Sequence, residues 1–405
     1  MTARIARTCV FGLSAIIVLN PPAAGAPLHV RTVAVRGQQP PGLDDGRTFL
    51  GFTNPILNNA GQTAFESFLG TISGGYDGSF GVWSEAGGQL GANVVGREQA
   101  PGTAPGTTFN SQFYFVFNDQ GKIAVKSTVV DPSNGGSLRD GIWLGTPGHM
   151  QLVALSGDVA PSGFGDTRFV QFDVPVLNRQ GTLAFAANFD GAYFPNFGYQ
   201  GIWTVSSGPP QLAVITEQSI LGGFESPFVN LGNTPFFEIF VPPYRPGLTS
   251  TGHVVFNAYT VLTSEPGDNG MWTNAGDPFQ LIMPATGSQA PGLAEGVLLG
   301  SVRRFVSNDT GQFVFSTLLA GAGVMSANSR SLWVFHGDQP TMVAREGDQA
   351  DGLPAGVRYQ TLFQYPQLDY HQDSLPSLNN AGQIAFVARL AGTGINASND
   401  TGIWR

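Results

Sequence analysis

The chain has 405 residues, of which 42% are hydrophobic, 11% aromatic and 12% charged, and its formal net charge is −9. This apolar content can bury a large core, so it excludes a wholly disordered chain, while the scarcity of charge argues against long solvated helices. An acidic chain without basic clusters also argues against nucleic acid and anionic membranes as partners.

The first 26 residues have the pattern of a signal peptide. Arg4 and Arg7 precede an apolar run from Cys9 to Leu19 that is too short to span a bilayer, and the small residues 23–26 offer a cleavage site. A buried N-terminal helix is the alternative. Removal of this segment would take the net charge from −9 to −11 and leave no Cys. We therefore expect an exported protein, extracellular or periplasmic, in which residues 27–405 form one domain with no transmembrane segment.

Three motifs recur six times along residues 27–405. The first is Gly-x-Trp or a variant of it, with its aromatic residue at Trp83, Trp143, Trp203, Trp272, Trp333 and Trp404. The second is Asn-x-x-Gly, with Thr in place of Asn in repeat 4, and its glycines are Gly61, Gly121, Gly181, Gly252, Gly311 and Gly382. The third resembles Gly-Asp-x-Ala-Pro-Gly and ends at Gly42, Gly102, Ser162, Gly222, Gly292 and Gly352. Their spacing defines a unit of about 60 residues, with 11 additional residues in repeats 4 and 6.

Each unit is predicted to contain four strands and tight turns. The Asn-x-x-Gly segments are typical of hairpin turns, in which Gly supplies the positive φ. The strands that follow are apolar on both faces, as in Leu183 to Ala187, which indicates a sheet covered on both sides. Six such units predict an all-β, six-bladed β-propeller.

The phase of the repeat predicts how the ring closes. The segment 29–36 is the strand that should follow Trp404, so we expect the N- and C-terminal strands to pair in the last blade. A β-solenoid or stacked sheets, and two domains of three units each, are the alternative architectures.

The string Asn58 to Phe65 reads Asn-x-x-Gly-x-x-Ala-Phe and recurs at Asn178 to Phe185 and Asn379 to Phe386. It resembles the bacterial secreted tandem-repeat proteins of the NxxGxxAF type, which are associated with varied C-terminal anchors such as PEP-CTERM tails. The resemblance implies export, but here only Arg405 follows the last Trp, so no such anchor is expected. It implies no activity and no catalytic residues.

Motifs that carry catalysis or metal binding are absent from the sequence. There is no phosphate-binding loop, no Gly-x-Ser-x-Gly and no His-Glu-x-x-His, and the five His have no zinc-ligand spacing. We therefore assign no catalytic residue, no metal and no cofactor. One Trp per repeat in a buried strand indicates core packing rather than sugar stacking. Glu98, Asp158 and Asp348 share one repeat position, where turn capping is favoured over a cation-binding ring.

Residues that break the repeat are the candidates for a binding site. The insertions span roughly 223–246 and 355–376 and are rich in aromatic residues, and loops on a rigid scaffold commonly carry function. The two insertions are expected to occupy the same position of the repeat and therefore to rise from one face, where they form a cleft for a neutral, hydroxyl-rich ligand. The alternative is an edge that covers its own apolar surface. The candidate binding residues are Phe236, Glu238, Phe240, Tyr244, Arg245, Tyr365, Asp369, Tyr370, His371 and Asp373.

Two functions are compatible with these features. The first is a non-enzymatic binding or scaffold module of the bacterial exterior, whose partner is a glycan or another extracellular macromolecule. The alternative is a secreted propeller hydrolase or lyase that acts on carbohydrate or lactone substrates. An enzyme needs non-repeated polar residues from several blades around one opening. The sequence offers such residues clearly from only one blade, so the first function is favoured.

Overall fold

The computed structural model describes residues 31–53, 55–71, 75–161, 166–190, 199–215, 236–239, 246–260, 269–275, 280–283, 286–335, 339–362 and 376–405. The chain divides into two units, residues 1–35 and 36–405. Residues 31–35, the described part of the first unit, form no strand. All described strands therefore lie in the second unit.

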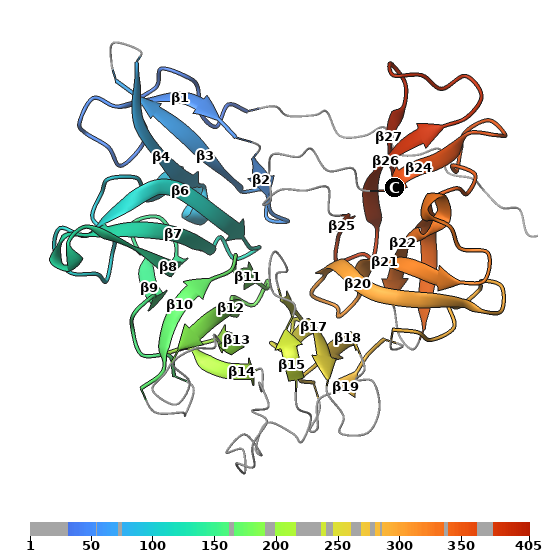
Figure 1. Cartoon of the computed structure of the whole chain (residues 1–405). Coiled ribbons are helices and arrows are strands. Elements are labelled where there is room, and N and C mark those ends of the chain that lie inside the picture. The colour runs from blue at the N-terminus through green and yellow to red at the C-terminus, as the bar shows by residue number, and fades with distance from the viewer. Residues whose placement is uncertain are drawn as a thin grey trace, which may run out of the picture. The chain divides into compact units, whose positions relative to one another are not determined.

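The described part of the second unit consists of six antiparallel sheets, coloured from blue for sheet 1 to red for sheet 6 (Figure 1). Sheet 1 contains β1 (Thr48–Phe52), β2 (Ile56–Leu57), β3 (Thr63–Gly70), β4 (Tyr76–Ser84) and β5 (Gly91–Val95). Sheet 2 contains β6 (Thr108–Phe117), β7 (Ile123–Asp131), β8 (Ser137–Gly145) and β9 (Gln151–Leu155). Sheet 3 contains β10 (Arg168–Phe172), β11 (Val176–Leu177), β12 (Leu183–Asp190), β13 (Tyr199–Val205) and β14 (Gln211–Ile215).

The second half of the chain repeats this pattern. Sheet 4 contains β15 (Phe236–Ile239), β16 (Gly247–Leu248), β17 (Val254–Thr260), β18 (Asn269–Thr273) and β19 (Gln280–Leu281). Sheet 5 contains β20 (Val297–Ser307), β21 (Phe313–Gly321), β22 (Arg330–Phe335) and β23 (Pro340–Arg345). Sheet 6 contains β24 (Arg358–Leu362), β25 (Ser377–Leu378), β26 (Ile384–Ala391) and β27 (Thr401–Trp404). Helix in the described residues is limited to the 3-10 turns η1 (Ala86–Gly88), η2 (Pro132–Asn134) and η3 (Ser326–Asn328), and none of these could cross a membrane.

One strand order is common to the sheets. An irregular first strand pairs with the strand after the Asn-x-x-Gly turn, which pairs with the Trp strand, which pairs with a fourth strand. The predicted all-β repeat of four strands is therefore present in the first five sheets. In sheet 6, β27 pairs with β26, and none of the described residues pairs with the other edge of β27. The predicted pairing of residues 29–36 with the Trp404 strand is thus not seen: residues 31–36 form no strand, and residues 29 and 30 lie outside the described residues.

The Trp side chains explain why Gly precedes them by two positions. Trp143 is completely buried, and its ring lies edge-on to Phe109, with 4.8 Å between ring centroids. A Cβ atom at Gly141 would lie 2.4 Å from the Cη2 atom of this ring, so only Gly leaves the space that the indole needs. The Nε1 atom of Trp143 donates a hydrogen bond of 2.9 Å to the carbonyl oxygen of Pro101. Trp83 and Trp203 lie in the same arrangement, which makes the repeated Trp a core residue.

Consecutive sheets contact one another along a set of interfaces that we call seams. In chain order, β4 contacts β6, β8 contacts β10, β13 contacts β15, β18 contacts β20, and β22 contacts β24. Buried side chains of sheets 1 and 2 form one hydrophobic cluster, and those of sheets 5 and 6 form another. The apolar strands are covered on both faces for this reason, as predicted.

The Asn-x-x-Gly turns connect neighbouring sheets as well as neighbouring strands. The turn glycines have positive φ, as expected; Gly61 and Gly121 have φ of 74° and 75°. In addition, the Asn side chains form a ladder of hydrogen bonds from sheet to sheet. The Nδ2 donors and their acceptor carbonyls are Asn58 to Asn118 at 2.8 Å, Asn118 to Asn178 at 2.9 Å, Asn178 to Thr249 at 2.8 Å and Asn308 to Asn379 at 2.9 Å.

Thr249 interrupts this ladder because it replaces Asn in repeat 4. Its Oγ1 accepts a hydrogen bond from the backbone N–H of His253, as the Asn Oδ1 does elsewhere. Thr lacks the amide Nδ2 that donates to the carbonyl of the next turn. Sheets 4 and 5 are instead connected by the backbone N–H of Ser250, which donates to the carbonyl of Asp309 at 2.8 Å.

Thr249→Asn should therefore stabilise the protein by about 1 kcal/mol, because it restores a donor for the carbonyl of Asn308. Thermal denaturation should show a midpoint about 1 °C higher, given the size of the unit. Thr249→Val is the control: it removes the Oγ1 acceptor and should lower the midpoint. Equal midpoints for Thr249→Asn and Thr249→Val would contradict the role assigned to the ladder.

Candidate functional site

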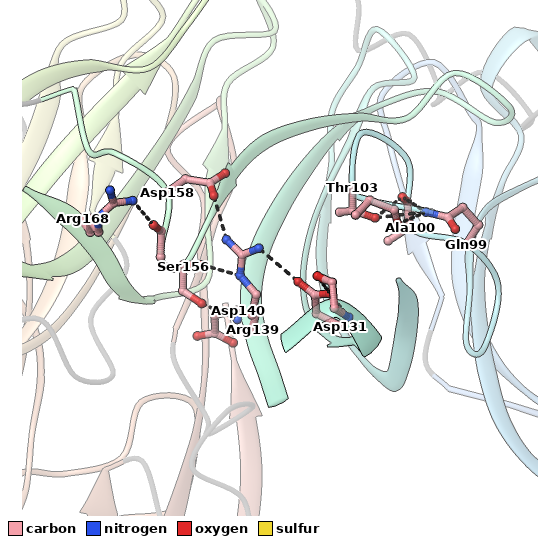
Figure 2. Close-up of polar contacts among 12 residues, drawn as sticks. Gln99, Ala100, Thr103, Asp131, Arg139, Asp140, Ser156, Asp158 and Arg168 are labelled. Atoms are coloured by element: carbon pink, nitrogen blue, oxygen red, sulfur yellow. Dashed lines mark hydrogen bonds and ion pairs between the residues drawn. The ribbon is translucent and has the colours of Figure 1, made fainter. Parts of the chain in front are cut away.

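Repeated polar residues are engaged in building the scaffold. Gln99 clamps the turn that follows it: its Nε2 donates to the carbonyl of Ala100 and to Oγ1 of Thr103, each at 3.1 Å, and its Oε1 accepts from the N–H of Gly106 at 2.8 Å (Figure 2). Gln289 and Gln349 bind the corresponding turns of sheets 5 and 6 in the same way. Since these side chains already have partners, the residues that differ between repeats are the candidates for a ligand site.

Asp158 and Glu98, two of the carboxylates at the shared repeat position, belong to separate ion pairs. Arg139 binds Asp158 at 2.7 Å and Asp131 at 3.4 Å, and its Nε donates to the carbonyl of Ser156 at 2.7 Å (Figure 2). Glu98 instead pairs with Arg47. Among the described residues, no group of three or more His, Cys, Asp or Glu could hold a metal ion.

Most of the binding residues predicted from the insertions lie outside the described residues. These are Phe240, Tyr244, Arg245, Tyr365, Asp369, Tyr370, His371 and Asp373. Phe236 and Glu238 lie in β15, where they pair with Thr260 and Tyr259 of β17. The described residues therefore do not test whether the ten residues lie together, and their shared cleft stays a prediction.

The strand register assigns Phe236 differently from the sequence. Phe236 pairs with β17 at the position where Phe49 pairs with β3 and Phe169 pairs with β12, so it belongs to the first strand of its sheet rather than to an inserted loop. The additional residues of repeat 4 are divided between the segments before and after β15. In repeat 6 they all follow β24, whose Tyr359 keeps the usual distance from Gly352. The expectation that both insertions occupy one position of the repeat is thus wrong.

Charged side chains that break the repeat gather at the seam between sheets 2 and 3. Lys126 on β7 forms an ion pair with Asp140 on β8, with 3.6 Å between Nζ and Oδ2, and its Nζ lies 5.9 Å from the centre of the Tyr114 ring on β6. The Oδ2 of Asp140 also accepts a hydrogen bond from the N–H of Phe172 on β10 at 3.3 Å. Asp173 follows Phe172 and is close enough to both charges for them to affect its ionisation.

Two carboxyl groups at successive seams titrate near neutral pH. The pKa of Asp173 is raised to about 7, mainly by burial; the positive charge of Lys126 opposes this rise and the negative charge of Asp140 adds to it. Burial likewise raises the pKa of Glu66 on β3 to about 7, against a hydrogen bond from the backbone N–H of Phe113 across the seam between sheets 1 and 2. Such groups can donate or accept a proton at physiological pH, or bind hydroxyl groups of a ligand.

Glu66, Lys126 and Asp173 lie outside the two insertions and were therefore not among the predicted site residues. A signal was available in the aligned repeats. Glu66 and Lys126 occupy the position of Ala186 and Val387, on a strand that is otherwise apolar on both faces. A charged residue at such a position must lie against the neighbouring sheet, where burial is costly without a partner.

Comparison with known proteins places the chain in a family. Residues 23–221 and 228–405 match the family of unknown function DUF7453, and the chain belongs to that family. No curated protein matches the sequence.

Among solved structures, the chain is similar to an α-L-arabinanase of Penicillium chrysogenum, with 10% identity, a TM-score of 0.33, and coverage of 92% of this chain and 97% of that one. It is also similar to a protein of unknown function from Dyadobacter fermentans, with 12% identity, a TM-score of 0.29, and coverage of 74% and 87%. The polysaccharide lyase Uly1 is similar with 9% identity, a TM-score of 0.37, and coverage of 87% and 76%.

Proposed function

We propose that the chain is an exported six-bladed β-propeller that binds a neutral, hydroxyl-rich partner, such as a glycan of the bacterial exterior, without catalysing a reaction. The observation that supports the proposal is that the repeated polar residues bind the scaffold, whereas the non-repeated ones do not share these contacts. Trp143, Asn118 and Gln99 form hydrogen bonds with the scaffold itself, so ligand contacts are left to residues that differ between repeats. A rigid scaffold with variable segments is the usual basis of a binding module.

The architecture of the proposal is supported by the order of the sheets. Six sheets of similar strand order contact one another in chain order, and the Asn ladder connects neighbouring turns at equivalent positions. A ring closed by pairing of the terminal strands extends this arrangement by one more seam. Export is proposed from the signal-like segment 1–26, and the repeat motif is similar to that of secreted NxxGxxAF proteins.

The chemistry of the ligand is inferred from charge and composition. The formal net charge of −9, which becomes −11 without the first 26 residues, repels polyanions. The two insertions supply Tyr, Phe and His with few charges, and aromatic rings with scattered hydrogen-bonding groups suit the alternating apolar and hydroxyl faces of a sugar.

A glycan array probed with the purified chain lacking residues 1–26 tests this function. We expect binding to neutral glycans that weakens at least tenfold in Tyr370→Ala and remains unchanged in Tyr76→Ala. Tyr76 is a suitable control because it is an exposed tyrosine of β4 outside the insertions. Binding to no glycan, or binding that both variants weaken equally while remaining folded, would contradict the proposal.

A hydrolase or lyase acting on carbohydrate or lactone is the second candidate function. The carboxyl groups of Glu66 and Asp173, whose pKa values are about 7, favour it, because a general acid or base works best when its pKa is near the operating pH. Turnover of polysaccharide or lactone substrates that Asp173→Asn or His371→Ala abolishes would support the enzyme in place of the binding module.

A further inference from the structure

The residue at one position of the repeat forms a hydrogen bond across a seam in two of the sheets, as a donor in one and as an acceptor in the other. Asn257 on β17 uses its Nδ2 to donate to the carbonyl of Val302 on β20, at 3.1 Å, across the seam between sheets 4 and 5. Glu66 on β3 holds the same place in its repeat, five residues after the turn glycine. Its carboxylate accepts from the backbone N–H of Phe113 on β6, across the seam between sheets 1 and 2. The seam between sheets 4 and 5 therefore contains a donor that does not ionise, Asn257, and the seam between sheets 1 and 2 contains an ionisable group, Glu66.

The seam between sheets 2 and 3 also contains an ionisable group in a mixed environment. Asp173 follows Phe172, whose N–H binds Asp140 across this seam, and Asp140 is paired with Lys126. The charge of Lys126 lowers the pKa of Asp173 and the charge of Asp140 raises it. Tyr114 of β6 lies beside Lys126. At the first seam, Tyr76 of β4 is the titratable group coupled to Glu66, and it also interacts with Asp77 and Arg97. Burial is the main reason why the pKa of Glu66 is raised.

The direction of the response follows from linkage. Burial raises both folded-state pKa values from the ordinary values of 4.5 and 3.8 to about 7, so the folded protein holds protons that the unfolded chain has released. The contribution to stability is fully present below the unfolded values and is lost as pH rises through about 7. Protonation gives the carboxyl an O–H donor and removes a charge that is costly to bury. The protonated group then resembles the amide of Asn257, which is always neutral and always has a donor.

We propose that the two seams of sheet 2 respond to pH: with Glu66 and Asp173 protonated, mildly acidic solution holds sheets 1, 2 and 3 together more firmly, and neutral to alkaline solution loosens them. The seam between sheets 4 and 5 keeps the neutral Asn257 contact and serves as the internal reference. This behaviour would adjust the stiffness of one side of the molecule to the acidity of its surroundings, whatever ligand it binds.

Hydrogen exchange of the full chain without residues 1–26 tests the proposal. Exchange is measured at about pH 5.5 and about pH 8.5 and corrected for the intrinsic rate. Peptides from β6 and β10 should lose protection at least tenfold at the higher pH relative to peptides from β20, since a change of one in a pKa corresponds to a factor of ten in an equilibrium constant. An equal change in β6, β10 and β20 would overturn the proposal, and this comparison needs no variant.

Two variants sharpen the experiment. Glu66→Gln combined with Asp173→Asn fixes neutral groups at both seams and should abolish the difference between pH values in β6 and β10. The reciprocal change Asn257→Asp should give β20 a new loss of protection at the higher pH. An undiminished response in the double variant would assign the effect to other groups and refute the proposal.

Discussion

Trp143→Ala should lower the free energy of unfolding by about 3–5 kcal/mol, the range for removing a large buried aromatic side chain. Trp143 is completely buried and contacts Phe109 edge-on, and its indole N–H donates a hydrogen bond to the carbonyl of Pro101. The variant would leave a cavity and an unpaired carbonyl in the cluster that sheets 1 and 2 share. Denaturation by guanidinium chloride, followed by tryptophan fluorescence, measures the loss.

Gly141→Ala tests the same packing from the opposite side. The added Cβ would lie 2.4 Å from the Trp143 ring, so the indole must move, at a cost of about 1–3 kcal/mol. Leu138→Ala on the same strand is the control, because Leu138 is 60% exposed and should change stability little. Should Trp143→Ala instead abolish ligand binding and leave stability intact, the Trp would be a recognition residue rather than a core residue.

Repeat 5 shows how the chain accommodates a departure from this motif. Ser331 replaces the Gly before Trp333, and Trp333 turns its Nε1 to the Ser331 hydroxyl at 2.8 Å instead of binding a turn carbonyl. Trp333 is nevertheless completely buried. In repeat 5, therefore, the indole stays buried and its N–H stays hydrogen-bonded, while the acceptor changes.

The strands and turns could be predicted because their causes are local. The sequence shows one turn glycine in each repeat, an apolar strand after each turn and one Trp per repeat. The sheets are built from these strands and turns. The Asn ladder could not be predicted, because each Nδ2 donates to a carbonyl of the next repeat. Asn118, for example, binds the carbonyl of Asn178. Motif spacing determines the turn but not which groups of the neighbouring sheet come within reach.

The candidate site was harder to predict for two physical reasons. The spacing of flanking motifs gives the length of an insertion but not its position within the repeat, so Phe236 was assigned to a loop although its register is that of a first-strand residue. The pKa values of Glu66 and Asp173 depend on burial between sheets. That burial is set by how the sheets pack, which the sequence of a single strand does not reveal.

A disulfide between Cys residues at positions 34 and 403 should form and stabilise the protein by about 4 kcal/mol if the proposed ring closes through its terminal strands. The register comes from sheet 1, where Val82 of β4 pairs with Val94 of β5. Ala34 and Ile403 hold these positions in the first and last repeats. Ile403 is 79% exposed in the described structure, whereas Val82 is completely buried, so β27 has an apolar side chain that a further strand would cover.

The chain suits this experiment because Cys9, its only Cys, lies in the signal-like segment. Ala34→Cys with Ile403→Cys should cross-link on mild oxidation and shift on a non-reducing gel, whereas Ala34→Cys with Leu138→Cys should not. A chain that begins at Arg36 should melt at a lower temperature, because it lacks the closing strand. The truncation must stop there: Gly37 donates to the carbonyl of Phe49, and Pro41 accepts from Trp83, so a deletion to residue 43 would also damage sheet 1. Absence of the cross-link, together with an unchanged melting temperature for the chain that begins at Arg36, would rule out closure by residues 29–36 and favour an open array of sheets.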